Sequence, residues 1–333
     1  MDDTIKRWMR PVVYPPLHAW QWFHDHSRSK LREYEARWRD YREKSAIRRD
    51  GTIIVRDIHG IRFVMYPFDR PNLLTLVRRP NDVAEFQAIP SLVRSGNVAL
   101  DVGANLGLYS VLLSRLCGRE GRVWAFEPVP ETYWRLRETL ALNRCGNVTA
   151  VQEAVYESKG VVQVNVFEPE FSEWNTLGKP VMQASDGSRH LPKTAIDVPS
   201  VTLDQFCERE GIERINFLKV DVEGFEMSVF VGAERLLREH RVDHICFEIS
   251  QDPLKAAGLE SRRVFEALEL HGYHVYHFEK RSGRFKGPIH DTSELWANFF
   301  ASWRDLSHTS GAPNDNASHR SDDRVGSMPV KAG

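Results

Sequence analysis

The residues best suited to chemistry begin with a glycine-containing loop that directly follows an apolar run. The run starts at Val98 and ends in Asp101, and the loop then carries Gly103, Asn105 and Gly107. Glycine permits positive φ and lets a ligand approach bare backbone, and the apolar residues after the loop predict a helix that packs on a sheet. A loop of this kind before a helix N-terminus predicts a nucleotide-binding site.

The order of residues in this loop separates two classes of nucleotide. Dinucleotide sites use G-x-G-x-x-G around an anionic pyrophosphate, whereas this loop reads G-x-N-x-G and is preceded by Asp101. A carboxylate there would repel a pyrophosphate, but it suits the ammonium and sulfonium of S-adenosylmethionine (SAM). Glu127 ends the next apolar strand and could accept hydrogen bonds from both ribose hydroxyls. We therefore expect SAM as the cofactor, with an NAD-dependent oxidoreductase as the less favoured alternative.

A charged run in a segment that should be a buried strand is the second candidate site. Residues 215–226 read Ile-Asn-Phe-Leu-Lys-Val-Asp-Val-Glu-Gly-Phe-Glu. Strand alternation puts Lys219 and Asp221 on one face, together with Glu223 if the chain stays extended. A buried lysine needs a partner, and Asp221 and Glu248 are the available carboxylates. The alternative is an ion-pair network that only fixes strand register.

The strand-end acids are expected to lie together, because ligands of open α/β sheets bind at the carboxyl ends of the strands. Asp101, Glu127, Asp221 and Glu248 all end predicted strands. We therefore expect these four residues to surround one crevice.

A long polar loop over residues 168–195 predicts a lid that selects the second substrate. It contains Trp174 beside Asn175, and an aromatic face with an amide suits a carbohydrate; the alternative is that the aromatic side chains only anchor the loop. Glu153 and Ala154, at the end of the strand before it, are where the adenine should be met.

Composition restricts the classes of function. The net charge is −1, so no overall field favours nucleic acid, although residues 1–50 carry 12 Lys and Arg against 8 Asp and Glu. The four cysteines lack C-x-x-C spacing, which argues against a zinc site and a disulfide framework. No apolar run is long enough for a membrane span or a signal sequence, so we expect a cytoplasmic protein.

Four motifs together resemble those of the FkbM family of SAM-dependent methyltransferases, over about residues 55 to 300. They are Asp101-Val-Gly-Ala-Asn-Leu-Gly-Leu-Tyr-Ser110, Phe126-Glu-Pro128, Thr202-Leu-Asp204 and Leu218-Lys-Val-Asp-Val-Glu-Gly-Phe-Glu226. The resemblance implies an α/β Rossmann-like class I fold with a mainly parallel seven-stranded sheet whose last strand is antiparallel. It also implies O-methylation of a hydroxyl on a sugar, glycolipid or natural product.

The chain then divides into four expected segments. Residues 1–50 form a basic and aromatic helical segment that docks on the main domain, on a second copy or on a membrane surface. Residues 51–89 form a β-hairpin and a linker helix, residues 90–304 the methyltransferase domain, and residues 305–333 a disordered tail.

An alcohol is a weak nucleophile, so the expected reaction needs a group that orients the hydroxyl or accepts its proton. Asp221, held by Lys219, is the first candidate, and Glu248 is the second. Glu223 and Glu226 are expected to contact the acceptor, with capping of the helix as the alternative for Glu226.

Several other interpretations stay open. Asp221 and Glu248 could bind Mg²⁺ and activate the acceptor, although Lys219 already supplies a positive charge there, so no metal is expected. His190 and His290 lie in predicted loops and are further candidate bases. The chain could also be a SAM-binding scaffold without catalysis.

Overall fold

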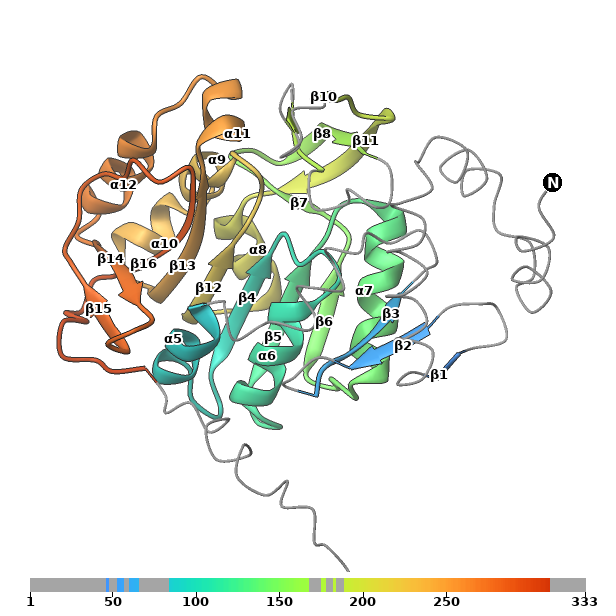
Figure 1. The fold of residues 1–333 in the computed structure, drawn as a ribbon, viewed down its shortest axis with the longest axis horizontal. Helices are drawn as coiled ribbons and strands as arrows, with labels where there is room; N and C mark the ends of the chain where they lie inside the picture. Colours follow the sequence, from blue (N-terminus) through green and yellow to red (C-terminus); the bar gives the residue numbers. More distant parts are fainter. Residues whose placement is uncertain are drawn as a thin grey trace, which may run out of the picture.

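The computed structural model describes residues 46–47, 53–56, 60–65, 84–167, 175–177, 182–183 and 189–311. Its centre is an eight-stranded sheet with the order β15-β14-β16-β13-β12-β4-β5-β6, covered by helices on both faces (Figure 1). The strands are β4 (Val98–Val102), β5 (Arg122–Phe126), β6 (Val148–Val151), β12 (Ile215–Val220), β13 (Val242–Ser250), β14 (His274–Glu279), β15 (Arg284–Lys286) and β16 (Trp296–Ser302).

The direction of the strands confirms the expected fold class. β12 pairs in parallel with β4 and β13, and β4 and β6 pair in parallel with β5. β16 is antiparallel to both β13 and β14, so the last strand of the expected seven is the antiparallel one. β15 is a short additional strand at the edge.

Apolar helix faces bury both sides of this sheet. One side packs against α5 (Glu85–Leu92), α6 (Leu108–Cys117) and α7 (Pro130–Leu142). The other side packs against α8 (Leu203–Glu210), α9 (Glu226–Val231), α10 (Glu234–Arg238) and α12 (Ser261–Glu269). A further short helix, α11 (Gln251–Ala256), directly follows β13.

The Thr202-Leu-Asp204 motif has a structural role in this layer. Thr202 accepts a hydrogen bond from the backbone N–H of Gln205 and so caps α8. The carboxylate of Asp204 accepts the backbone N–H groups of Arg235 and Leu236, at 2.9 and 3.0 Å, where α10 begins. The motif therefore fixes two helix N-termini behind the sheet.

Smaller sheets flank the main one. β1 (Ala46–Ile47), β2 (Ile53–Arg56) and β3 (Arg62–Met65) form an antiparallel sheet, whose Arg62 backbone exchanges two hydrogen bonds with Asn143 at the end of α7. β7 (Ala154–Val155), β11 (Thr194–Val201) and β8 (Gly160–Val166) form another, and β9 (Met182–Gln183) pairs with β10 (Arg189–His190). The β7-β11-β8 sheet lies beside the carboxyl ends of the central strands (Figure 1).

Three expected segment boundaries need correction. Residues 46–47, assigned to the N-terminal helical segment, form a strand that pairs with β2. The helix α5 crosses the expected boundary at residue 90 and belongs to the core of the main sheet. Residues 305–311 are ordered and not tail, because Leu306 is buried and Ser310 bridges to Arg284.

The rest of the N-terminal and C-terminal expectations lie outside the described residues. Across the described ranges, no helix combines the length and the apolar character that a membrane crossing requires.

Candidate functional site

A cavity of about 540 Å³ lies at the carboxyl ends of the parallel strands, where the fold class predicts a ligand. Its wall includes residues from β5, β13 and β16, the loops after β4 and β12, and residues 175–177. Nine of the residues expected in the site line it, namely Gly103, Asn105, Glu127, Glu153, Ala154, Asn175, Asp221, Glu223 and Glu248.

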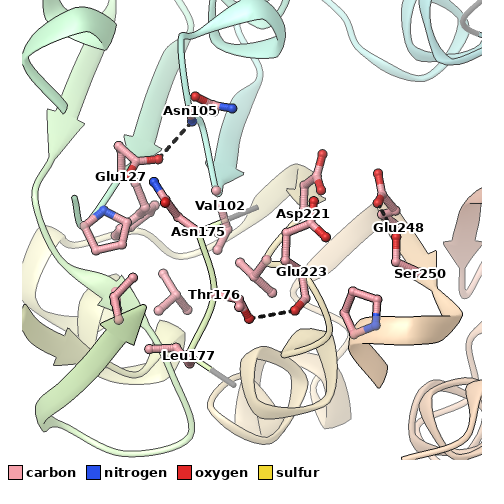
Figure 2. A pocket seen from close by; sticks show the side chains of 18 of the residues that line it. Val102, Asn105, Glu127, Asn175, Thr176, Leu177, Asp221, Glu223, Glu248 and Ser250 are labelled. Carbon is pink, nitrogen blue, oxygen red and sulfur yellow. Dashed lines mark hydrogen bonds between the residues drawn. The ribbon is translucent and has the colours of Figure 1, made fainter. Parts of the chain in front are cut away.

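Glu127 holds the loop after β4 in place. Its Oε2 accepts the backbone N–H of Asn105 at 3.1 Å (Figure 2), and its Oε1 accepts the backbone N–H of Val129 at 2.9 Å. Burial raises the pKa of Glu127 to about 7, against the opposing effect of these two donors. A carboxylate has about four lone-pair positions, so positions for further donors remain.

Asp101 occupies a different place from the one expected. Its side chain is buried under α6, where Oδ2 accepts a hydrogen bond from Ser110 Oγ at 2.5 Å, and it does not line the cavity. Burial raises the pKa of Asp101 to about 6. The expectation that Asp101 faces the cofactor is therefore wrong: the residue supports the start of α6, because alternation along β4 turns it toward that helix layer.

Backbone conformation and packing inside the protein together favour glycine at both positions. A Cβ on Gly103, which has φ +80°, would lie 1.8 Å from the backbone oxygen of Asp221, so this loop touches the end of β12 directly. Gly107, with φ +89°, begins α6, and a Cβ there would lie 2.7 Å from Leu136 Cδ1 of α7. Gly107 does not line the cavity, which corrects its expected role in cofactor binding.

Lys219 lies at the centre of the polar network, and its side chain is fully buried. Its Nζ donates to Asp221 Oδ2 at 3.2 Å and to Asn298 Oδ1 at 3.0 Å, and it lies 5.1 Å from the centre of the Tyr109 ring. Burial disfavours the charged ammonium, but the attraction of Asp221 and other nearby acidic groups outweighs burial and raises the pKa of Lys219. The expected partner is thus correct, but Lys219 is a positioning residue because it does not reach the cavity.

Glu248 differs from Asp221 in its environment. Burial first, and then the charge of Asp221, raise the pKa of Glu248 to about 8. Its Oε1 accepts a hydrogen bond from Ser250 Oγ at 2.7 Å. Neighbouring carboxyl groups with different environments can take different roles, and the raised pKa of Glu248 favours its protonated form.

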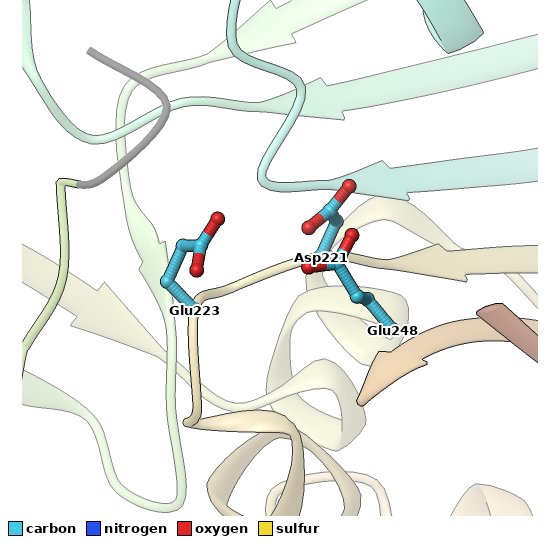
Figure 3. Close-up of side chains that lie close together, drawn as sticks. All are labelled: Asp221, Glu223 and Glu248. Carbon is cyan, nitrogen blue, oxygen red and sulfur yellow. The ribbon is translucent and has the colours of Figure 1, made fainter. Parts of the chain in front are cut away.

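Glu223 lies beside these two acids although its backbone is not extended as strand alternation had assumed. The chain leaves the extended conformation at Glu223, with φ +50°, yet oxygens of Asp221, Glu223 and Glu248 lie within 4.8 Å of one another (Figure 3). The backbone oxygen of Glu223 accepts a hydrogen bond from Thr176 Oγ1 at 2.9 Å (Figure 2). The three carboxyl groups form an acidic cluster on the cavity wall.

Glu226 supports this turn from behind. Its side chain is 1% exposed, and its Oε1 accepts the backbone N–H groups of Val222 and Gly224 at 3.4 and 3.2 Å. The residue does not line the cavity, so the expected contact with the acceptor is wrong, and it does not cap α9 either, because both donors belong to the turn before that helix. Burial raises the pKa of Glu226 to about 7.

Of the described residues in the long loop, residues 175–177 line the cavity. Asn175 Oδ1 accepts the backbone N–H of Phe167, and Thr176 pairs with Asn165, so this part of the loop is tied to β8. Trp174 lies outside the described residues.

Two further candidates are paired with other side chains, and the side chain of a third cannot be placed. Glu153 lines the cavity, but its carboxylate pairs with Arg209 at 2.6 Å. His290 is 74% exposed and bonded to Glu269, away from the cavity wall, so it is not a candidate base. The side chain of His190 lies outside the described part of the structure.

Sequence reasoning missed the contribution of the last strand. Trp296 and Asn298 line the cavity, as do Tyr109 and Ser250. An antiparallel strand begins where its parallel neighbours end, so the first residues of β16 reach the ligand edge. The polar Asn298 inside an apolar run was the available signal.

Comparisons with known proteins find a matching family and several similar sequences. A family profile described as the methyltransferase FkbM domain matches residues 101–275. Hexuronic acid methyltransferase AglP of Haloferax volcanii is 28% identical over 173 residues, covering 52% of this chain and 61% of that protein. The 2-O-methyltransferase NoeI of Sinorhizobium fredii is 26% identical over 203 residues, covering 58% and 80%.

A third relative is the 31-O-demethyl-FK506 methyltransferase FkbM of Streptomyces tacrolimicus. It is 30% identical over 162 residues, covering 43% of this chain and 61% of that protein. The matched part of this chain therefore spans less than two thirds of the length of the Haloferax and Streptomyces relatives.

We predict that Glu226→Gln changes how stability depends on pH. The folded-state pKa of about 7 lies above the ordinary 4.5, so the stabilising contribution of Glu226 is complete below pH 4.5 and is lost as the pH rises through about 7. Glutamine does not titrate but keeps an accepting oxygen. From about pH 5 to about pH 8, the free energy of unfolding of the parent should therefore fall relative to that of the variant, by at most about 3 kcal/mol. Urea unfolding measures this gain, and a constant difference at both pH values would contradict it.

Proposed function

Because the chain belongs to the FkbM family of methyltransferases, we propose that it transfers a methyl group from SAM to a hydroxyl of a sugar, glycolipid or natural product. Two of the relatives carry names that specify O-methylation or an O-demethylated substrate, and a third is named for a hexuronic acid. The observation that carries the proposal is that one cavity joins the loop after β4 to the acids after β12 and near the end of β13.

The residues on the β4 and β5 side fit the cofactor. Asn105 Oδ1 is buried without a hydrogen-bond partner among the described residues, so it suits a donor from a ligand. Glu127 has lone pairs left for the ribose hydroxyls, and Ala154 provides apolar surface for the adenine.

The residues on the β12 and β13 side fit the acceptor. When bound, SAM supplies an electrophilic methyl group on a sulfonium. Asp221 Oδ2 accepts a hydrogen bond from Lys219. Its Oδ1 has no donor among the described residues and can accept a hydrogen bond from the acceptor hydroxyl. Asp221 thus orients the hydroxyl oxygen and takes its proton as the new C–O bond forms and the methyl–sulfur bond breaks, with S-adenosylhomocysteine as the leaving group. Lys219 keeps this carboxylate in position, and Glu248, whose pKa is raised by burial, can donate a hydrogen bond beside it when it is protonated.

A magnesium-assisted reaction is the second candidate. The close approach of Asp221, Glu223 and Glu248 favours it, because Mg²⁺ binds carboxylate oxygens. The nearby Lys219 ammonium already supplies positive charge, which favours the metal-free reaction.

We predict that Asp221→Asn and Lys219→Met each nearly abolish methyl transfer. The amide of Asp221→Asn keeps the shape but cannot accept the proton, so affinity for S-adenosylhomocysteine should stay within a few fold. The assay is transfer of labelled methyl from SAM to extract fractions of sugars, lipids and small metabolites. Asp197→Asn, at an exposed position, is the control for loss of a carboxylate. Full turnover by Asp221→Asn would reject Asp221 as the proton acceptor, and no binding of S-adenosylhomocysteine by the parent would reject the proposed cofactor.

We predict that EDTA leaves the rate of methyl transfer unchanged, since the proposed proton transfer needs no cation. The same assay, with the chelator and then with added Mg²⁺, measures this. Loss of activity that Mg²⁺ restores, together with a loss in Glu223→Gln, would instead establish the metal-assisted reaction.

A further inference from the structure

An exposed tryptophan stands at the wall of the cavity, at the start of β16. Trp296 is 60% exposed and its neighbour Leu295 is 76% exposed, and both line the cavity. An exposed aromatic side chain on a cavity wall offers a large contact surface to a ligand. Trp296 therefore offers its ring to a ligand on the acceptor side of the cavity.

Strand geometry places an amide beside this ring. Residues i and i+2 of a strand lie on the same face, about 6.7 Å apart, so Trp296 and Asn298 face the same side of β16. Across the antiparallel pair, Trp296 lies opposite Ser250 and Asn298 lies opposite Glu248. All four residues line the cavity. They form one wall with an aromatic ring at its outer end and polar groups at its inner end.

Lys219 determines which end of the Asn298 amide is left for a ligand. An ammonium can only donate, so the atom 3.0 Å from Lys219 Nζ must be the carbonyl oxygen. The NH₂ group of Asn298 has no partner within the described ranges. The buried lysine thus presents two complementary groups to the acceptor: an accepting oxygen on Asp221 and a donating NH₂ on Asn298.

We propose that Trp296 and Asn298 form the acceptor subsite and that this subsite holds a sugar ring. The inference rests on the proposed function and narrows its substrate class. A sugar offers a C–H face that stacks on Trp296 and hydroxyls that pair with Asn298, Ser250 and Asp221. A fatty chain or a flat apolar compound would cover Trp296 but leave the buried polar groups without partners, which disfavours its binding.

The test uses full-length protein saturated with S-adenosylhomocysteine, whose binding is first measured by calorimetry. Saturation-transfer NMR then follows methyl β-D-glucopyranoside, with hexan-1-ol as the apolar probe. Trp296→Ala should lower the affinity for the glycoside by about three- to tenfold, while Trp296→Phe retains most of it. The matched control is Trp134→Ala on α7, because Trp134 is also 60% exposed but does not line the cavity.

A second variant tests the amide. Asn298→Asp replaces the donating NH₂ by an oxygen and should also weaken binding of the glycoside. Equal glycoside binding by the parent and Trp296→Ala, or binding of hexan-1-ol but not of the glycoside at Trp296, would overturn the proposal. Failure of S-adenosylhomocysteine to bind would reject the proposed function, separately from the acceptor subsite.

Discussion

The buried ammonium of Lys219 is the constraint on which the rest of the site depends. An unpaired charge in the centre of a parallel sheet would cost several kcal/mol, so the fold must bring partners to it. They come from three elements: Asp221 after the same strand, Asn298 on β16 and the Tyr109 ring on α6. Satisfying this one charge therefore fixes the carboxylate, the amide and the ring in the same small region.

Strand order then arranges the chemistry in space. Moving across the sheet from β5 through β4, β12 and β13 to β16, the cavity presents Glu127, Asn105, Asp221, Glu248 and Asn298. Neighbouring strands are about 4.8 Å apart, and Asp221 follows β12, which lies between β4 on the cofactor side and β13 on the acceptor side. The proposed cofactor and acceptor sides thus meet at the residue that Lys219 holds, and the antiparallel β16 completes the acceptor side because it begins at the same edge.

Sequence pattern predicted the fold class and brought Glu127, Asp221 and Glu248 to one cavity, because strand-end acids in a parallel sheet meet at one edge. It failed where tertiary packing decides the outcome. Asp101 accepts a hydrogen bond from Ser110, Gly107 leaves room for Leu136, and Glu226 accepts backbone N–H groups of a turn. Residue spacing alone does not distinguish these structural roles from ligand binding. Asn298 and Trp296 were missed because they lie at the start of an antiparallel strand, whereas the rule for open α/β sheets points to the carboxyl ends of the parallel strands.

A double-mutant cycle between Lys219 and Asp221, read out as the free energy of unfolding in urea, tests the central role of this charge most directly. Asp221→Asn in the parent leaves a buried ammonium without its carboxylate, whereas in Lys219→Met no charge needs compensation. The account predicts that Asp221→Asn is much less destabilising in the Lys219→Met protein, with a coupling of about 2 kcal/mol or more. Additive effects within about 0.5 kcal/mol would contradict it.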